Sequence, residues 1–245
     1  MEWSDDGIVL STRSHGESGI IVMLLTRDHG RHAGLARGQK LRAQLQPGTG
    51  VRARWRARLA EHLGSYAVEP TTSAAALVID DPLRLAALAS ACAVVEAAVP
   101  ERAVVPGVFE GLEALLAALT GRHWDAAYVQ WEIGVLGALG FGLDLKRCAA
   151  SGVNDDLAYV SPRSGRAVSL SAGEPYRDRL LPLPGFLVGR GAAEPAAVLE
   201  GLDLTGHFLE RNLFGQNHLP VPPARTRYVE RYRRAATTSG IFPAP

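Results

Sequence analysis

The stretch that decides the fold lies at residues 51–59, which read Val-Arg-Ala-Arg-Trp-Arg-Ala-Arg-Leu. Successive side chains of a β-strand point to opposite faces, so this alternation of apolar residues and arginines predicts a strand. A helix would scatter the arginines over two sides and leave the apolar residues without a common stripe. We therefore expect one face, with Trp55 at its centre, to enter a core. The other face would carry four exposed arginines, Arg52, Arg54, Arg56 and Arg58.

Four like charges in a row repel one another, and the segment itself contains no acid. Alternate strand residues lie about 6.6 Å apart, so the row would span about 20 Å, or roughly six phosphate steps of one DNA strand. A polyanion is the natural partner, unless acids on neighbouring strands offset the repulsion. The alternative is an edge strand that uses charge against aggregation, for which one or two lysines usually suffice. No tyrosine or phenylalanine is interleaved to stack on bases, so contact with a phosphate backbone is favoured.

The arginine-rich segment belongs to a larger basic block. Residues 27–58 hold nine basic side chains against one acid, and residues 211–245 hold six against one acid. Residues 59–210 hold ten basic and nineteen acidic side chains, so the formal net charge of the chain is only +1. Segregation of this kind indicates an anionic partner, of which nucleic acid is the commonest. The plain alternative is a solvated, arginine-rich surface.

This distribution yields two sets of predicted nucleic-acid contacts. The primary set comprises Arg37, Lys40, Arg42, Arg52, Arg54, Arg56 and Arg58. Lys40 and Arg42 precede a strong turn signal, Pro-Gly-Thr-Gly at residues 47–50, and would extend the row. A secondary set lies near the C-terminus and comprises Arg225, Arg227, Arg231, Arg233 and Arg234.

The pattern along the chain predicts an α+β protein. Short strands are expected at residues 7–11, 19–26, 32–36, 51–59 and 65–69, which suit a small barrel such as the OB fold. Helices are expected at residues 82–99, 106–120, 123–141, 196–214 and 224–235, with a hairpin at 158–168. We therefore predict an N-terminal OB-fold β-barrel domain at residues 1–80. An all-helical domain with a small irregular hairpin insertion would follow at residues 81–245.

Catalytic and metal signatures are weak. The chain contains no GxxxxGK[ST], GxSxG or HExxH motif. His29 and His32 have HxxH spacing, but only Asp28 lies beside them, so a structural role is favoured over a metal site. The acidic pair Asp155 and Asp156 lacks the converging carboxylates that a two-metal nuclease needs.

Composition excludes several classes of protein. With 47% hydrophobic and 21% charged residues, the 245-residue chain is globular. Two cysteines rule out a disulfide framework and indicate a reducing compartment. The first residues lack a signal-peptide pattern, and no apolar run reaches the length of a membrane span. We expect a cytoplasmic protein that does not contact membranes.

A series of short motifs follows in order along most of the chain. They include Trp-Ser-Asp-Asp-Gly-Ile-Val-Leu at 3–10, His-Gly-Glu at 15–17, Leu-Leu-Thr-Arg-Asp-His-Gly at 24–30, Gly-Leu-Ala-Arg-Gly at 34–38, Leu-Gln-Pro-Gly at 45–48 and Trp-Arg-Ala-Arg-Leu at 55–59. Further pieces are Trp-Glu-Ile at 131–133, Leu-Gly-Phe at 139–141, Leu-Asp-Leu at 143–145, Cys148 and Ala-Arg-Thr-Arg at 224–227. Each is modest alone, but together they resemble the bacterial RecO family of recombination mediators.

The resemblance implies an OB fold, a helical domain and DNA repair by the RecFOR route. RecO proteins bind single- and double-stranded DNA and anneal complementary strands. They act with RecR and the single-strand-binding protein to help load RecA, which would associate this chain with the nucleoid. The resemblance implies no enzymatic turnover and no cofactor. It places the contact for single-strand-binding protein in the helical domain without assigning residues.

One departure from the family concerns zinc. Many members hold zinc with two CxxC pairs after the central helix, but here Ser151 stands at the CxxC spacing from Cys148 and no cysteine follows. One thiolate cannot supply the four ligands of a structural zinc site. We predict a metal-free, degenerate zinc-module-like insertion at about residues 144–175. Its support would come from Tyr159, Val160 and Val168.

Three other functions stay open. A generic OB-fold RNA-binding module would share the basic barrel, and competition between RNA and DNA of matched length separates the two. A metal-dependent nuclease would cleave labelled DNA with magnesium or manganese, so annealing without cleavage excludes it. A pure protein-binding scaffold would have no DNA affinity to lose when the arginines become glutamate.

Overall fold

The computed structural model describes residues 1–16, 19–38, 41–59 and 61–238. The chain divides into two compact units. The first comprises residues 1–121 with 222–228, and the second comprises residues 122–221 with the chain from 229 onward. The domain boundary at residue 80 stays a prediction.

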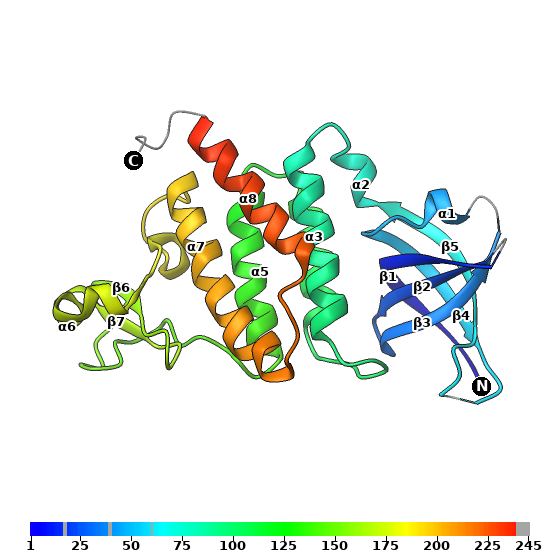
Figure 1. The fold of residues 1–245 in the computed structure, drawn as a ribbon, viewed down its shortest axis with the longest axis horizontal. Helices are drawn as coiled ribbons and strands as arrows, with labels where there is room; N and C mark the ends of the chain where they lie inside the picture. Colours follow the sequence, from blue (N-terminus) through cyan, green and yellow to red (C-terminus); the bar gives the residue numbers. More distant parts are fainter. Residues whose placement is uncertain (17–18, 39–40, 60, 239–245) are drawn as a thin grey trace. The chain divides into compact units, whose positions relative to one another are not determined.

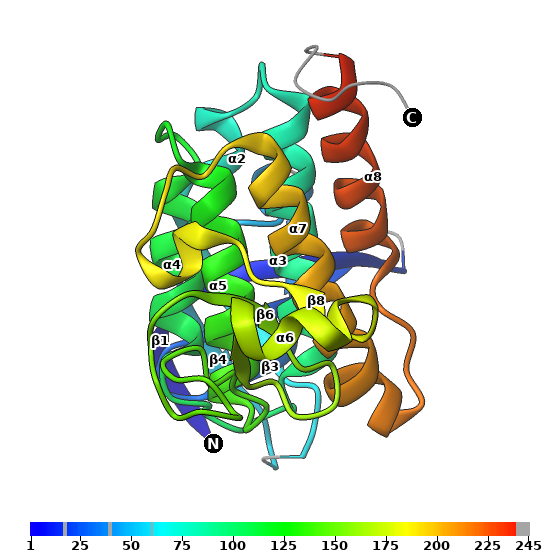
Figure 2. The same ribbon diagram turned by 90° about the vertical axis from the view of Figure 1, so that its left-hand side faces the viewer.

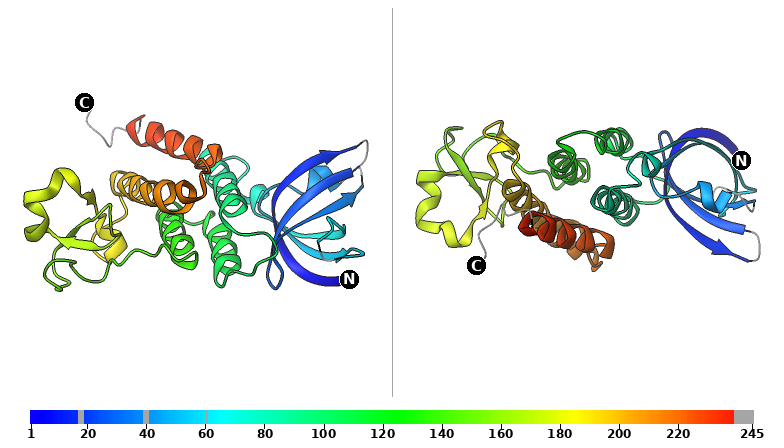
Figure 3. Two further views of the ribbon diagram at one scale, coloured as in Figure 1. Left: turned by 60° about the horizontal axis from the view of Figure 1, so that its bottom comes forward. Right: turned by 90° about the horizontal axis from the view of Figure 1, so that it is seen from above.

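Within the described residues of the first unit, five strands form a ring (Figures 1 and 3). They are β1 (Glu2–His15), β2 (Gly19–Thr26), β3 (Gly30–Arg37), β4 (Thr49–Arg56) and β5 (Ser65–Ser73). Their order around the ring is β1-β2-β3-β5-β4. The β3–β5 seam is narrow, because the described residues of these parallel strands pair at Leu35 and Ser65 alone. The predicted OB-type fold is thereby confirmed, since OB folds are five-stranded, partly open barrels.

Alternation within β4 builds much of the barrel core. Val51, Ala53 and Trp55 are buried, as predicted, and the indole N–H of Trp55 donates to the carbonyl oxygen of Leu63 at 3.0 Å. Trp3 stacks against Trp55, with ring centroids 5.6 Å apart. Burying large apolar side chains is the main stabilising term of such a small core.

Strand β1 is longer than the predicted strand at residues 7–11. Its N-terminal half was missed because Ser4, Asp5 and Asp6 interrupt the apolar pattern. Asp5 is buried nevertheless, and its carboxylate accepts the backbone N–H of Asp28 at 2.8 Å and lies 2.9 Å from Nδ1 of His29. These contacts satisfy the buried carboxylate and explain its place in the strand.

Within residues 1–121, the described part of the first unit contains four α-helices. They are α1 (Leu41–Gln44), α2 (Ala74–Leu77), α3 (Pro82–Ala98) and α4 (Val108–Ala118). Asp81 caps α3 by accepting the backbone N–H groups of Leu83 and Arg84, and Pro82 occupies the first helical position, as expected for a helix start. The short helix α1 was not predicted, and Leu45 directly after it enters the barrel core.

The second unit contains α5 (Trp124–Ala138), α7 (Pro195–Phe208) and most of α8 (Pro223–Thr238). Buried Glu132 of α5 accepts the hydroxyl of Thr205 of α7. The chain segment that joins α5 to α7 contains β6 (Leu157–Val160), β7 (Ala167–Ser169) and β8 (Leu181–Pro182). These strands form a small sheet next to α6 (Leu170–Gly173) (Figure 2). The predicted hairpin is confirmed, while the two-residue strand β8 was not predicted. Among the described helices of either unit, none is long and apolar enough to span a membrane.

Candidate nucleic-acid interface

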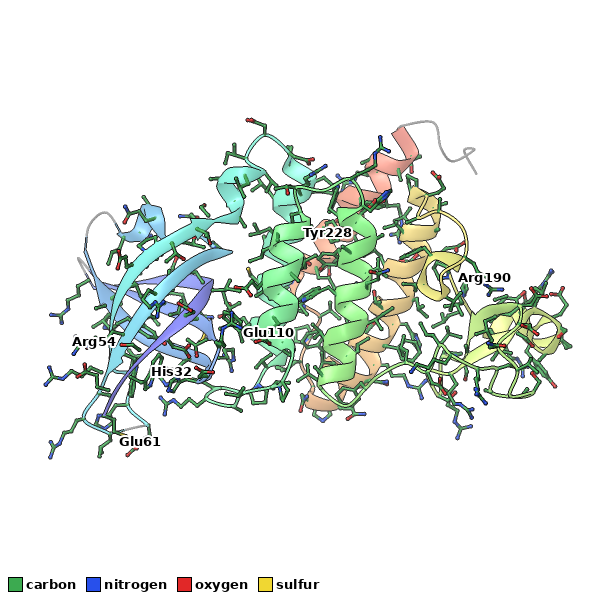
Figure 4. The ribbon with its side chains drawn as sticks, turned by 180° about the vertical axis from the view of Figure 1, so that it is seen from behind. His32, Arg54, Glu61, Glu110, Arg190 and Tyr228 are labelled. Carbon is green, nitrogen blue, oxygen red and sulfur yellow. The ribbon has the colours of Figure 1, made fainter. Side chains whose placement is uncertain are left out.

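The outward side chains of β4 are the arginines that the alternation predicts. Arg52, Arg54 and Arg56 are exposed, whereas the residues between them are buried. Arg58 is also exposed but lies beyond the strand, which ends at Arg56. Figure 4 labels Arg54 on the outer side of the barrel strands and His32 within the barrel.

Strand β4 is not an edge strand. It pairs with β1 on one side and with β5 on the other along its whole length. Arginines on a strand that is paired at both edges have no role in preventing edge-to-edge aggregation. This removes the edge-strand alternative to a binding role for the row.

Acids on the neighbouring strands partly neutralise the row, which the sequence could not show. Arg52 forms an ion pair with Asp6 of β1 at 3.1 Å, and Arg54 forms one with Glu2 of β1. Glu69 of β5 is a third exposed acid, opposite Arg52 in the strand register. The bare row of positive charge that the segment alone predicts is therefore corrected to a row with cross-strand counter-charges.

Free positive charge increases toward the end of β4. The side chains of Arg56 and Arg58 have no ion-pair partner among the described residues. Ser65 lies opposite Arg56 on β5 and adds no charge. The α-ammonium group of Met1 is close by, donating to the carbonyl oxygen of Ala57 at 2.6 Å. This end of the strand is the strongest candidate contact for an anion.

A hollow lies at the β3–β5 seam and includes one of the predicted cations, Arg37. It has a volume of about 520 Å³ and lies between Leu35 and Arg37 on one side and Ser65, Ala67 and Val68 on the other. Arg37 ends β3 and is exposed, as is Arg42 in α1. Arg37 thus stands at one side of a partly apolar hollow, and Ser65, on its other side, pairs with Arg56 in the register of β4 and β5. Lys40 lies outside the described residues.

Two other arginines of the basic block are structural. Arg27 forms ion pairs with Glu110 at 2.9 Å and Glu113 at 3.3 Å, and its guanidinium covers the ring of Phe109. Arg31 donates to the carbonyl oxygen of Val99 at 2.7 Å. Glu110, labelled in Figure 4, belongs to α4, so these arginines connect the barrel to helices of its own unit.

Comparison with known proteins decides the family. Residues 1–74 match the family described as "Recombination protein O N terminal", and residues 79–219 match the family described as "Recombination protein O C terminal". A DNA repair protein RecO of Rhodospirillum centenum is 60% identical, with both chains fully covered. Proteins of the same name from Rhodospirillum rubrum and Phenylobacterium zucineum are each 52% identical; 96% of this chain is covered, and 97% and 99% of theirs.

The chain belongs to the RecO family. The resemblance read from the motifs is confirmed, because the matches run through both halves of the chain.

The insertion of this RecO chain does not suit a zinc ion. The Sγ atom of Cys148 is buried, accepts the backbone N–H of Ser169 at 3.3 Å and lies 3.4 Å from its hydroxyl. Serine stands at the second CxxC position, and the described residues contain no cluster of three or more His, Cys, Asp or Glu side chains that could hold a metal. Val160 and Val168 are buried beneath the small sheet, and Tyr159 is half-buried.

The C-terminal set of predicted contacts is only partly exposed in this RecO chain. Arg225 is 6% exposed, so it is not accessible to a polyanion and its assignment is corrected. Arg233 forms an ion pair with Asp203 at 2.8 Å, and Arg234 pairs with Glu230 at 3.5 Å. Arg227 and Arg231 are exposed.

Proposed function

We propose that this protein is a non-enzymatic DNA-repair mediator that binds single- and double-stranded DNA through the outer face of its barrel. The observation that carries the proposal is a set of exposed arginines of the first unit that form no ion pair among the described residues: Arg37, Arg42, Arg56 and Arg58. Of these, Arg37 also lines the hollow at the β3–β5 seam. Membership of the RecO family supports the assignment.

The mechanism is electrostatic. Guanidinium groups neutralise phosphates and release the cations condensed on the nucleic acid, which makes binding favourable and salt-dependent. Two strands bound to one protein repel each other less, so complementary strands meet and pair more often. Contacts with phosphate carry no sequence information, which suits a protein that must act on any damaged sequence.

Protein partners complete the proposed role. We assign RecR and the single-strand-binding protein as direct partners, with RecA loading as the outcome. The helical domain is the proposed contact for the single-strand-binding protein, and the cytoplasmic nucleoid is the proposed place of action. No cofactor is needed for these steps.

Strand annealing tests the proposal. The variant Arg56→Glu/Arg58→Glu should anneal complementary oligonucleotides much more slowly than the wild type. The control Arg163→Glu/Arg179→Glu makes the same change of charge in the second unit, at two exposed arginines that have no ion pair among the described residues. Circular dichroism should show that all three proteins are folded. Equal annealing by the two variants would contradict the proposed interface.

Two further arms separate the alternative functions. Cleavage of labelled DNA in the presence of magnesium or manganese would replace the mediator by a nuclease. Preferential binding of RNA over DNA of matched length and sequence would indicate an RNA-binding module. The mediator predicts annealing without cleavage and no preference for RNA.

A further inference from the structure

We propose that Glu2 and Asp6 are built-in counter-anions that compete with phosphate for Arg54 and Arg52 and so limit the strength of DNA binding. The inference rests on the proposed function, because it concerns the same arginine row. It assigns a regulatory role to two acids whose negative charge repels DNA.

The geometry of three adjacent strands carries the inference. In the register of β1 and β4, Asp6 lies opposite Arg52, and Glu2 lies opposite Arg56. The Glu2 carboxylate nevertheless reaches diagonally to Arg54, which leaves Arg56 without a carboxylate partner among the described residues. The arginine side chains of both pairs remain about two-thirds exposed, at 65% for Arg52 and 66% for Arg54. An incoming phosphate can therefore reach both guanidinium groups from solvent.

A carboxylate and a phosphate present the same kind of oxygen acceptor to a guanidinium group. Exposed ion pairs are weak, so phosphate can displace the carboxylate, but the displacement opposes binding. The carboxylate also keeps its negative charge beside the bound phosphate, so the phosphate is less fully neutralised and fewer counterions are released. Binding through a paired arginine is consequently weaker and less salt-dependent than binding through a free one.

The row then has graded strength along its length. Arg52 is flanked by Asp6 and Glu69 on the two neighbouring strands, and Arg54 is engaged by Glu2 alone. Arg56 and Arg58 form no ion pair with any residue that the structure describes. A phosphate chain is held firmly at the end of β4 and loosely at its beginning, which suits a protein that must release the paired product after annealing.

Neutral amide variants test the competition. Glu2→Gln and Asp6→Asn should each tighten binding of a single-stranded oligonucleotide by about two- to fivefold, the range expected for one exposed ion pair. In the double variant, the log–log salt slope should steepen by up to about 1.4, or about 0.7 for each freed arginine on a single strand. Melting temperatures should show that the variants are folded.

The matched controls are Glu61→Gln and Asp80→Asn, which remove one exposed negative charge of the same unit. Neither acid has an ion-pair partner among the described residues, and Glu61 lies in the loop after β4 (Figure 4). Long-range attraction alone predicts the same gain for the controls as for Glu2→Gln and Asp6→Asn. Equal gains would overturn the inference while leaving the proposed function intact.

A double-mutant cycle identifies the path of the effect. In an Arg54→Gln background, Glu2→Gln should no longer change DNA affinity, because the competing pair is already absent. An undiminished effect in that background would overturn the inference. A wild type without measurable DNA affinity would overturn both the inference and the proposed function. If Arg56→Gln weakens DNA binding relative to the wild type but Glu2→Gln leaves it unchanged, the inference alone is overturned.

Discussion

At the scale of single residues, the two cysteines illustrate how surroundings set chemistry. Burial raises the pKa of the Cys92 thiol to about 12. Burial acts in the same direction on Cys148, but hydrogen bonds from Ser151 and Ser169 outweigh it and lower its pKa to about 6. These hydrogen bonds favour the thiolate form of Cys148 near neutral pH. Ser151, the residue at the CxxC spacing, thus helps to stabilise the Cys148 anion.

A titration checks the state of Cys148. The ultraviolet absorbance of thiolate should appear in one step near pH 6 in the folded wild type and should be missing from Cys148→Ser. The folded-state pKa lies below the ordinary value of 9.0, so the thiolate contributes stability above pH 9 that is lost as the pH falls toward 6. Wild-type stability should accordingly fall relative to Cys148→Ser over that range. A thiol that titrates only above pH 8 would contradict this assignment.

Sequence reasoning at the residue scale reached one half of the interface. The outward arginines of β4 were predictable because strand alternation is a local signal. Their ion pairs were not, since Glu2 and Arg54 lie 52 positions apart in the chain. The polar alternation of Glu2, Ser4 and Asp6 around Trp3 was the available signal for an outward acidic face. Burial of Arg225 likewise depends on tertiary packing that a helical pattern does not reveal.

At the scale of elements, side chains of the first unit hold the segment at residues 61–64, just before β5. Gly64 adopts a left-handed conformation with φ of +66°, and a Cβ atom there would lie 2.4 Å from Nε1 of Trp55. Arg102 donates hydrogen bonds to the carbonyl oxygens of Glu61 and His62, at 3.0 and 3.1 Å. This segment is therefore held to the barrel by the Trp55 indole and by Arg102.

Two glycine substitutions separate the contact with Trp55 from backbone strain. Gly64→Ala should lower the free energy of unfolding by about 2–4 kcal/mol, from left-handed strain plus the steric clash. Gly107→Ala shares the strain, with φ of +81°, but meets no atom within 4 Å. It should lower stability by only about 1–2 kcal/mol. Urea unfolding measures both, and equal losses would show that Gly64 does not depend on Trp55.

Elements with local signals were predictable from the sequence. Proline and aspartate mark the start of α3, and apolar spacing marks α4 and α5, so these helices lie within a few residues of their predicted bounds. The N-terminal half of β1 was missed because it contains a buried acid, Asp5. Its hydrogen-bond partners, Asp28 and His29, lie just after β2 and are remote in the sequence. Helix α1 is too short to show a periodic pattern. Tertiary contacts decide such segments, and a single sequence does not display them.

At the scale of the whole molecule, segregation of charge matters more than its total. A chain with a formal net charge of +1 exerts little long-range attraction on DNA, so binding must come from local clusters. Arg27 and Arg31 of the basic block make structural contacts, an ion pair and a hydrogen bond respectively. Arg52 and Arg54 form ion pairs with acids of β1. Under the proposed function, Arg56 and Arg58, which have no ion pair among the described residues, carry much of the DNA interaction.

The most direct test of the central claim is the salt dependence of single-stranded DNA affinity, measured for the wild type and for Arg56→Gln/Arg58→Gln. The account predicts that log affinity falls linearly with log salt concentration for the wild type. It also predicts that the variant loses about 1.4 from that slope, or about 0.7 for each phosphate contact removed. An unchanged slope in the variant, or a wild-type affinity that does not respond to salt, would contradict it.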